Sequence, residues 1–177
     1  WNKWDILVTP SVSASVSNPS VSVTGDNAFA HTMTQLVFVF KAGTDAGVSD
    51  LARLRGYKLC SVITDATFNI TSYTLAPGTT PGDIAVTGIT EASGTQYEAT
   101  PLIVVPQTPS GNISLEVYFD GNTYRASLTP PTDGLQAGYS YTYTVTIKNT
   151  ALEVSNAEIS GWKTDANFNG DVDATLQ

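Results

Sequence analysis

Hydrophobic and polar residues alternate in short runs along the whole chain, and clusters of Gly, Pro, Asn and Asp separate these runs. Alternation with a period of two places successive side chains on opposite faces of a strand. A helical period never extends beyond two turns. Its best instance is residues 48–57, where we expect one helical turn leading into a strand. The pattern predicts an all-β protein built as a sandwich or barrel.

Individual runs predict different kinds of strand. Residues 31–40 end in a stretch that is apolar on both faces, which is typical of a central strand. Residues 112–128 alternate around Asp120 and Gly121, which predicts a hairpin with a tight turn. The other predicted strands are residues 5–9, an edge strand within 10–23 interrupted by Pro19, 66–75 with Ala66, Phe68 and Ile70 on its dry face, 83–89, 100–108, 139–148 and a return over 152–162.

A row of tyrosines at every second position raises two alternatives, an exposed aromatic platform or the inner face of a strand. The row contains Tyr139, Tyr141 and Tyr143 and continues with Val145 and Ile147. Exposing these five side chains together would cost several kcal/mol at ~25 cal/mol per Å² of apolar surface. We therefore expect the row to face inward, with the hydroxyl groups reaching the rim of the sandwich for hydrogen bonds.

Composition and charge narrow the class of protein. The chain has 177 residues, of which 41% are hydrophobic and only 14% charged, enough for one β domain with a buried core. Its net charge is −8, so the phosphates of nucleic acid would be repelled. The longest apolar run, residues 102–106, is much shorter than the ~20 residues that a membrane helix needs.

Few residues suit catalysis. His31 is the only histidine and Cys60 the only cysteine, so no disulfide can form within the chain and no mechanism can use two histidines. We expect His31 to be a structural, hydrogen-bonded residue and Cys60 a small buried hydrophobic one. The acidic residues lie singly, mostly in predicted turns, and the sequence has no Gly-x-Ser-x-Gly motif. The sequence therefore predicts a protein that is not an enzyme and needs no cofactor.

The C-terminal tail contains one pattern that resembles a calcium-binding loop. Its candidate ligands follow the first, third, fifth, seventh and ninth positions of a calcium loop around Gly170: Asp165, Asn167, Asn169, Asp171 and Asp173. Leu176 stands where such a loop has a bidentate acid, and neither flank predicts a helix. A polar tail that binds no metal is the alternative.

Several of these segments, taken in order, resemble the fimbrillin-like family, which comprises type V pilins and related surface lipoproteins of Gram-negative anaerobes. The similar segments are "WDILVTP", "FAHTMTQLVFVF", "LIVVPQT", "YFDGNTYRASL" and the stretch from "LQAGYSYTYTVTI" to "ISGW". Their order from residue 4 to residue 162 carries the resemblance.

The resemblance implies a transthyretin-like Greek-key β-sandwich of about seven to nine strands. It implies that residues 1–162 are the C-terminal domain of such a protein and 163–177 a polar tail, with an N-terminal domain preceding Trp1 in the full protein. It also implies secretion, a lipid anchor outside this chain as the contact with the outer membrane, and a place at the cell surface in a fimbria.

Assembly in this family is understood as exchange of β-strands between subunits, so the resemblance implies other fimbrial subunits as partners, with a host glycan or protein as a further ligand. The tail spaces its apolar residues by four, at Phe168, Val172 and Leu176, which is a poor pattern for a donated strand. A tip, accessory or non-fimbrial surface subunit is therefore as well supported as a stalk subunit. A carbohydrate-binding surface module is the alternative function.

Overall fold

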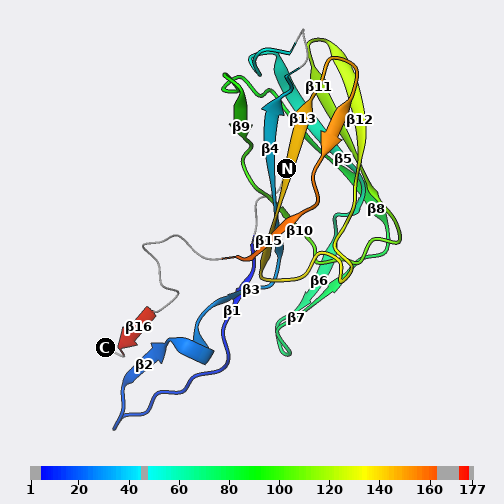
Figure 1. Ribbon diagram of the computed structural model, residues 1–177. Helices are drawn as coiled ribbons and strands as arrows, with labels where there is room; N and C mark the ends of the chain where they lie inside the picture. Colours follow the sequence, from blue (N-terminus) through cyan, green and yellow to red (C-terminus); the bar gives the residue numbers. More distant parts are fainter. Residues whose placement is uncertain (1–4, 45–47, 163–171, 176–177) are drawn as a thin grey trace.

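The computed structural model describes residues 5–44, 48–162 and 172–175, and these residues form an all-β protein, as predicted. The one helical element in these segments is a single 3-10 turn, η1 (Gly25–Asn27). Two β-sheets make an elongated sandwich, and a narrow N-terminal arm extends from one end of it (Figure 1). The transthyretin-like order of the strands stays a prediction.

The first sheet has two parallel strands at its centre, β4 and β13. Short strands border them: β9 and β10 both pair with β4, and β14 and β15 both pair with β13. β4 and β13 pair with each other along one edge. The other edge of β4 is therefore shared by β9 and β10, and the other edge of β13 by β14 and β15. The bounds are β4 (Thr34–Ala42), β9 (Gln96–Glu98), β10 (Leu102–Val104), β13 (Tyr139–Ile147), β14 (Leu152–Val154) and β15 (Glu158–Gly161).

The second sheet is antiparallel and has the order β12-β11-β5-β8. Its bounds are β5 (Leu54–Ile63), β8 (Pro81–Thr87), β11 (Ile113–Phe119) and β12 (Asn122–Leu128). The predicted hairpin is confirmed, because Phe119 pairs with Asn122 across the turn. Asp120 and Gly121 both have positive φ, of 51° and 74°, which a two-residue turn of this kind requires.

The core lies between the two sheets and takes residues from both. Phe38 of β4 packs against Tyr57 of β5 and Tyr143 of β13, with ring centroids 5.2 and 5.9 Å apart. Val37 and Val39, on the other face of β4, are also buried, so β4 is the central strand that its sequence predicts. Burying these aromatic and aliphatic side chains provides the main stabilisation of the sandwich.

The tyrosine row faces inward at all but its first position. Tyr141, Tyr143, Val145 and Ile147 are buried, whereas Tyr139 at the start of the strand is 41% exposed. The hydroxyl of Tyr141 donates to Gly134 O and accepts from the N–H of Gln136, and that of Tyr143 donates to Thr129 O. The prediction that the hydroxyls reach the rim is confirmed for these two residues, and the inward position is wrong for Tyr139.

Three further local predictions are wrong. The helical turn expected within residues 48–57 does not form, because residues 51–53 make a turn that leads directly into β5. Residues 66–75 do not form one strand but belong to a separate hairpin of β6 (Ala66–Asn69) and β7 (Thr74–Pro77) that leaves Ile70 77% exposed. The Oδ1 atom of Asn69 accepts hydrogen bonds from the backbone N–H groups of Thr71 and Ser72, which turns the chain. Cys60 is half-buried rather than buried, because it lies on the outer face of the second sheet.

The arm contains two small antiparallel ladders outside the sandwich (Figure 1). One pairs β1 (Leu7–Val8) with β3 (Ala30–His31), and the other pairs β2 (Ser20–Val23) with β16 (Val172–Thr175). The predicted edge strand within 10–23 forms only after Pro19. Before it, Ser15 and Asn18 close a tight turn that leaves Val16 fully exposed.

Candidate functional site

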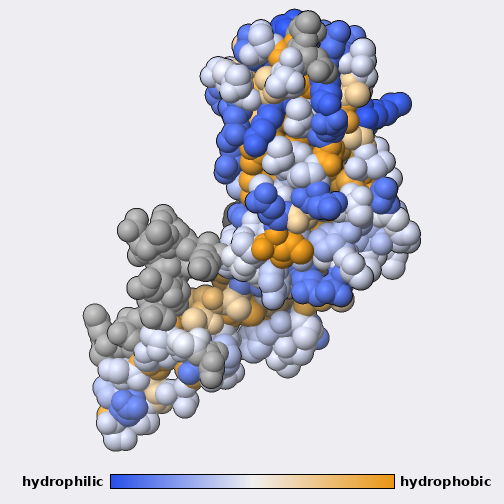
Figure 2. Space-filling view, viewed as in Figure 1, coloured by the Kyte–Doolittle hydropathy of each residue, from blue (hydrophilic) through white to orange (hydrophobic). Residues whose placement is uncertain are grey.

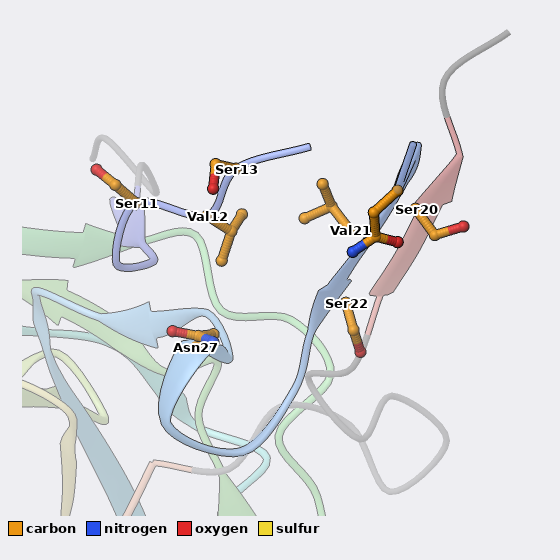
Figure 3. A pocket seen from close by; sticks show the side chains of 8 residues that line it. Ser11, Val12, Ser13, Ser20, Val21, Ser22 and Asn27 are labelled. Carbon is orange, nitrogen blue, oxygen red and sulfur yellow. The ribbon is translucent and has the colours of Figure 1, made fainter. Parts of the chain in front are cut away.

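A groove beside β2 is the main surface feature of the arm. One edge of β2 pairs with β16, with Val23 opposite Val172 and Ser20 opposite Thr175. On its other side β2 borders a groove of about 740 Å³ (Figure 3). The groove is lined by Ser11, Val12, Ser13, Asn18, Ser20, Val21, Ser22 and Asn27.

The chemistry of the groove suits an extended chain. Its lining residues are serines, asparagines and two valines, without a charged side chain. Figure 3 shows Val21 directed from β2 toward the segment that carries Val12. Among the described residues, the backbone of 11–13 makes no hydrogen bond, and β2 pairs with no strand except β16. Backbone donors and acceptors on both sides of the groove are therefore available to an added strand.

Three side chains join the arm to the sandwich, and we call them the clasp: Asp5, His31 and Trp162. The Nδ1 atom of His31 lies 2.5 Å from Oδ2 of Asp5, and the His31 ring stacks on the Trp162 ring with centroids 3.9 Å apart. The Asp5 and His31 side chains are only 16% and 10% exposed. The prediction that His31 is structural and hydrogen-bonded is confirmed. Through these contacts, the clasp joins the segment that leads into β1 to the residue that follows β15.

The clasp as a unit was not foreseen, although all three residues lie in segments that carry the family resemblance. Asp5 and His31 are 26 residues apart, and Trp162 lies far beyond both. The only sequence features that could have indicated this cluster are the single histidine, one acid and one tryptophan, which lie in three separate segments. Only the pairing of β1 with β3 and of β13 with β15 brings these segments together.

Charged side chains form a ladder across the outer face of the second sheet. Glu116 on β11 contacts Lys58 on β5 at 3.1 Å and Arg125 on β12 at 2.9 Å, and Lys58 also reaches Asp83 on β8 at 3.4 Å. The hydrogen bond from Lys58 is the largest factor that lowers the pKa of Glu116. The same bond raises the pKa of Lys58. Because each acid already has a basic partner, the ladder is a stabilising network.

The predicted calcium ligands fall mainly outside the described residues. This is true of Asp165, Asn167, Asn169 and Asp171, while the backbone of Asp173 lies in β16 opposite Ser22. The calcium loop therefore stays a prediction. Within residues 5–44, 48–162 and 172–175, no three His, Cys, Asp or Glu side chains come together as a metal site. No helix in these same segments has the length and apolar character needed to cross a membrane.

Comparison with protein families gives a match to the model described as fimbrillin-like over residues 2–162. The chain belongs to the fimbrillin-like family. This membership was anticipated by the resemblance in the sequence, and it indicates a fimbrial protein of the cell surface. No curated protein matches the chain.

Two solved structures support the fold of this fimbrillin-like chain. Both are crystal structures of candidate cell adhesion proteins, one from Bacteroides uniformis and one from Bacteroides ovatus. The first is 22% identical with a TM-score of 0.62 and matches 78% of this chain and 54% of its own. The second is 21% identical with a TM-score of 0.61 and matches 89% of this chain and 63% of its own. The chain therefore spans less than two thirds of either protein.

The matched family is described as fimbrillin-like, and both structural neighbours are described as candidate cell adhesion proteins. The family match supports a fimbrial subunit, and the two structures support its fold.

Proposed function

We propose that the chain is a non-catalytic fimbrial subunit that binds a neighbouring subunit by β-strand complementation in the groove beside β2. The observation that carries the proposal is the open edge of β2. It faces the unpaired backbone of residues 11–13 across the groove, whose volume is about 740 Å³. A strand inserted there would form backbone hydrogen bonds on both of its sides. Such a strand would extend the small sheet that β16 and β2 already form.

The lining of the groove indicates what the donated strand looks like. Val12 and Val21 supply apolar contacts, and the serines around them leave room for small or medium side chains. Since the groove has no charge, a strand with uncharged residues at its inward positions would lose the least hydration on binding. Alternating apolar and small polar side chains would set its register.

The tail has a separate role in this proposal. Residues 172–175 pair with β2 as β16, although the four-residue spacing of apolar side chains is unfavourable for a strand. By covering one edge of β2, β16 leaves only the groove side for a partner. In this view residues 1–162 act as one domain, and the tail of residues 163–177 directs which edge of the arm is used.

We place this subunit at the tip of a fimbria or in an accessory position. The basis is the family, together with the absence of an alternating apolar pattern in the tail that would suit repeated donation to further copies. Secretion, a lipid anchor and residence at the outer membrane belong to the same proposal. An adhesive subunit in such a position would bind a host glycan or protein.

The test mixes the chain with a second fimbrial subunit and follows complex formation by size-exclusion chromatography with light scattering. Val21→Asp places a charge in the groove and should abolish the complex. Val16→Asp is the matched control, because Val16 lies on the same arm but is fully exposed outside the groove. The proposal is wrong if both variants fold and bind the second subunit equally well.

A further inference from the structure

A second cavity lies on the rim of the sandwich, far along the chain from the groove, and we call it the rim pocket. It has a volume of about 400 Å³, within the range of ~300–1,000 Å³ typical of small-molecule sites. The loop after β12 and the segment leading into β15 form its walls. Its lining residues are Thr129, Pro130, Pro131, Thr132, Asp133, Asn156, Ala157 and Ile159.

The tyrosine row holds one wall of the rim pocket in place. Tyr143 donates its hydroxyl to Thr129 O at 3.3 Å, and Tyr141 donates to Gly134 O at 3.2 Å. The N–H of Gly134 also bonds Pro131 O at 2.8 Å. Gly134 has a φ of +77°, and a Cβ there would lie 2.7 Å from Gln107 O. The loop is therefore fixed by the core before any ligand binds.

The polar side chains of the rim pocket are uncommitted. In the described part of the chain, the hydroxyls of Thr129 and Thr132, the carboxylate of Asp133 and the side-chain amide of Asn156 make no hydrogen bond. A carboxylate and an amide offer acceptors and donors in one place, which suits a ligand with several hydroxyl groups.

The apolar part of the rim pocket lies beside these groups. Pro130, Pro131 and Ala157 are half-buried, and Ile159 is 53% exposed. Tyr139, which is 41% exposed, pairs with Gly161 and is thus a diagonal neighbour of Ile159 on the same face of the sheet. Diagonal neighbours are within reach of an aromatic side chain. Figure 2 shows hydrophobic atoms exposed on the sandwich near β15.

We propose that the rim pocket binds a neutral sugar residue of a glycan, which deepens the proposed adhesive function and rests on it. The C–H face of the sugar would pack on Ile159 and the prolines, with Tyr139 at the edge. Sugar hydroxyls would bond Asp133 and Asn156. Because the lining has one acid and no base, and the whole chain carries −8, sialylated and sulfated glycans are disfavoured.

The test applies the full chain to an array of glucose-, galactose- and N-acetylglucosamine-terminated oligosaccharides with their sialylated and sulfated counterparts. We expect binding to a neutral subset only. Asp133→Ala and Asn156→Ala should each weaken that binding at least tenfold in titration calorimetry, and Ile159→Ser should do the same. Glu98→Ala removes an exposed acid on β9, outside the rim pocket, and should change nothing.

Two outcomes would overturn the proposal: no neutral oligosaccharide is retained, or the retained one binds the rim-pocket variants as well as the parent chain. Retention of only sulfated or sialylated glycans would overturn it as well. Measuring assembly with a second subunit shows whether the sugar-binding proposal or the strand-complementation proposal has failed. Asp133→Ala leaves the groove beside β2 intact and should assemble normally, whereas Val21→Asp should bind sugar normally and fail to assemble.

Discussion

Three tyrosines of the core differ in what their hydroxyl groups contact. Tyr141 makes two hydrogen bonds with the loop at residues 134–136, and Tyr143 makes one, with Thr129 O. The hydroxyl of Tyr57 is buried and has no partner among the described residues. Burial is the main cause that raises the pKa of Tyr57, and it raises that of Tyr143 to about 12. The same residue type therefore has opposite consequences for stability at different positions.

Replacing Tyr57 and Tyr143 by phenylalanine should shift stability in opposite directions. Tyr57→Phe removes a buried unpaired hydroxyl and should raise the free energy of unfolding by about 1 kcal/mol. Tyr143→Phe leaves Thr129 O without its donor and should lower it by about 1 kcal/mol. Urea unfolding followed by fluorescence measures both, with the parent chain as reference. Equal effects of the two substitutions would contradict this assignment of partners.

At the scale of elements, register decides how the charged ladder forms. Glu116 stands directly opposite Lys58 on one side and Arg125 on the other, so one carboxylate connects three strands of the second sheet. Cross-strand pairs of opposite charge stabilise a sheet. Since the hydrogen bond from Lys58 is the largest cause that lowers the pKa of Glu116, the native state favours the ionised form of this residue.

The lowered pKa of Glu116 predicts a pH dependence. Above the ordinary pKa of 4.5 the carboxylate is ionised in both states, and the ladder stabilises the native state in full. As pH falls through the lowered native pKa, the unfolded state binds the proton first and this stabilisation is lost. Stability should therefore begin to decline as pH falls below about 4.5, and the decline should end only when the pH is below the lowered native pKa. Urea unfolding at several pH values measures the slope.

Glu116→Gln should flatten the decline in stability at low pH, because the glutamine has no proton to gain over this range. Glu98→Gln, on an exposed position of β9 that makes no ion pair in the described segments, serves as the control. An identical slope in Glu116→Gln and the parent chain would show that the ladder contributes nothing to the acid sensitivity.

At the scale of the whole molecule, the sandwich and the arm differ in how they are held. The sandwich has a continuous core, whereas the arm depends on two short ladders and the clasp. The groove beside β2 lies on the arm, and the rim pocket lies on the sandwich. Assembly and ligand binding would therefore use separate parts of the molecule.

The calcium loop predicted from the tail can be tested on the intact protein. If Asp165 and the other oxygen ligands bind Ca²⁺ in the native state only, millimolar Ca²⁺ should raise the melting temperature by a few degrees. Asp165→Ala should remove this rise, and Glu98→Ala, which also removes one acid, should keep it. Differential scanning calorimetry measures the effect. A melting temperature that does not respond to Ca²⁺ rules the site out.

Strands with a clear alternation of apolar and polar residues could be predicted from the sequence, whereas the grooves and pockets between them could not. The hairpin at residues 112–128 and the inward tyrosines follow from local periodicity and turn residues alone. Residues 66–75 alternate too, yet the hydrogen bonds of Asn69 turn them into a hairpin with Ile70 exposed. A local pattern indicates which strand faces are apolar, but it does not indicate which of them pack against another strand or sheet.

The sequence by itself determined that the chain is all-β, that β4 is central, that Tyr141 and Tyr143 are buried and that the protein is fimbrillin-like. These properties depend on periodicity, composition and the order of segments. Only the tertiary structure decided the clasp, the groove beside β2 and the rim pocket. The clasp and the rim pocket join residues that are distant in sequence, and their contacts depend on strand register and on how the two sheets pack, so no single stretch of sequence contains them. The groove lies within residues 11–27, but it forms only because the chain turns at Ser15–Asn18 and brings residues 11–13 beside β2.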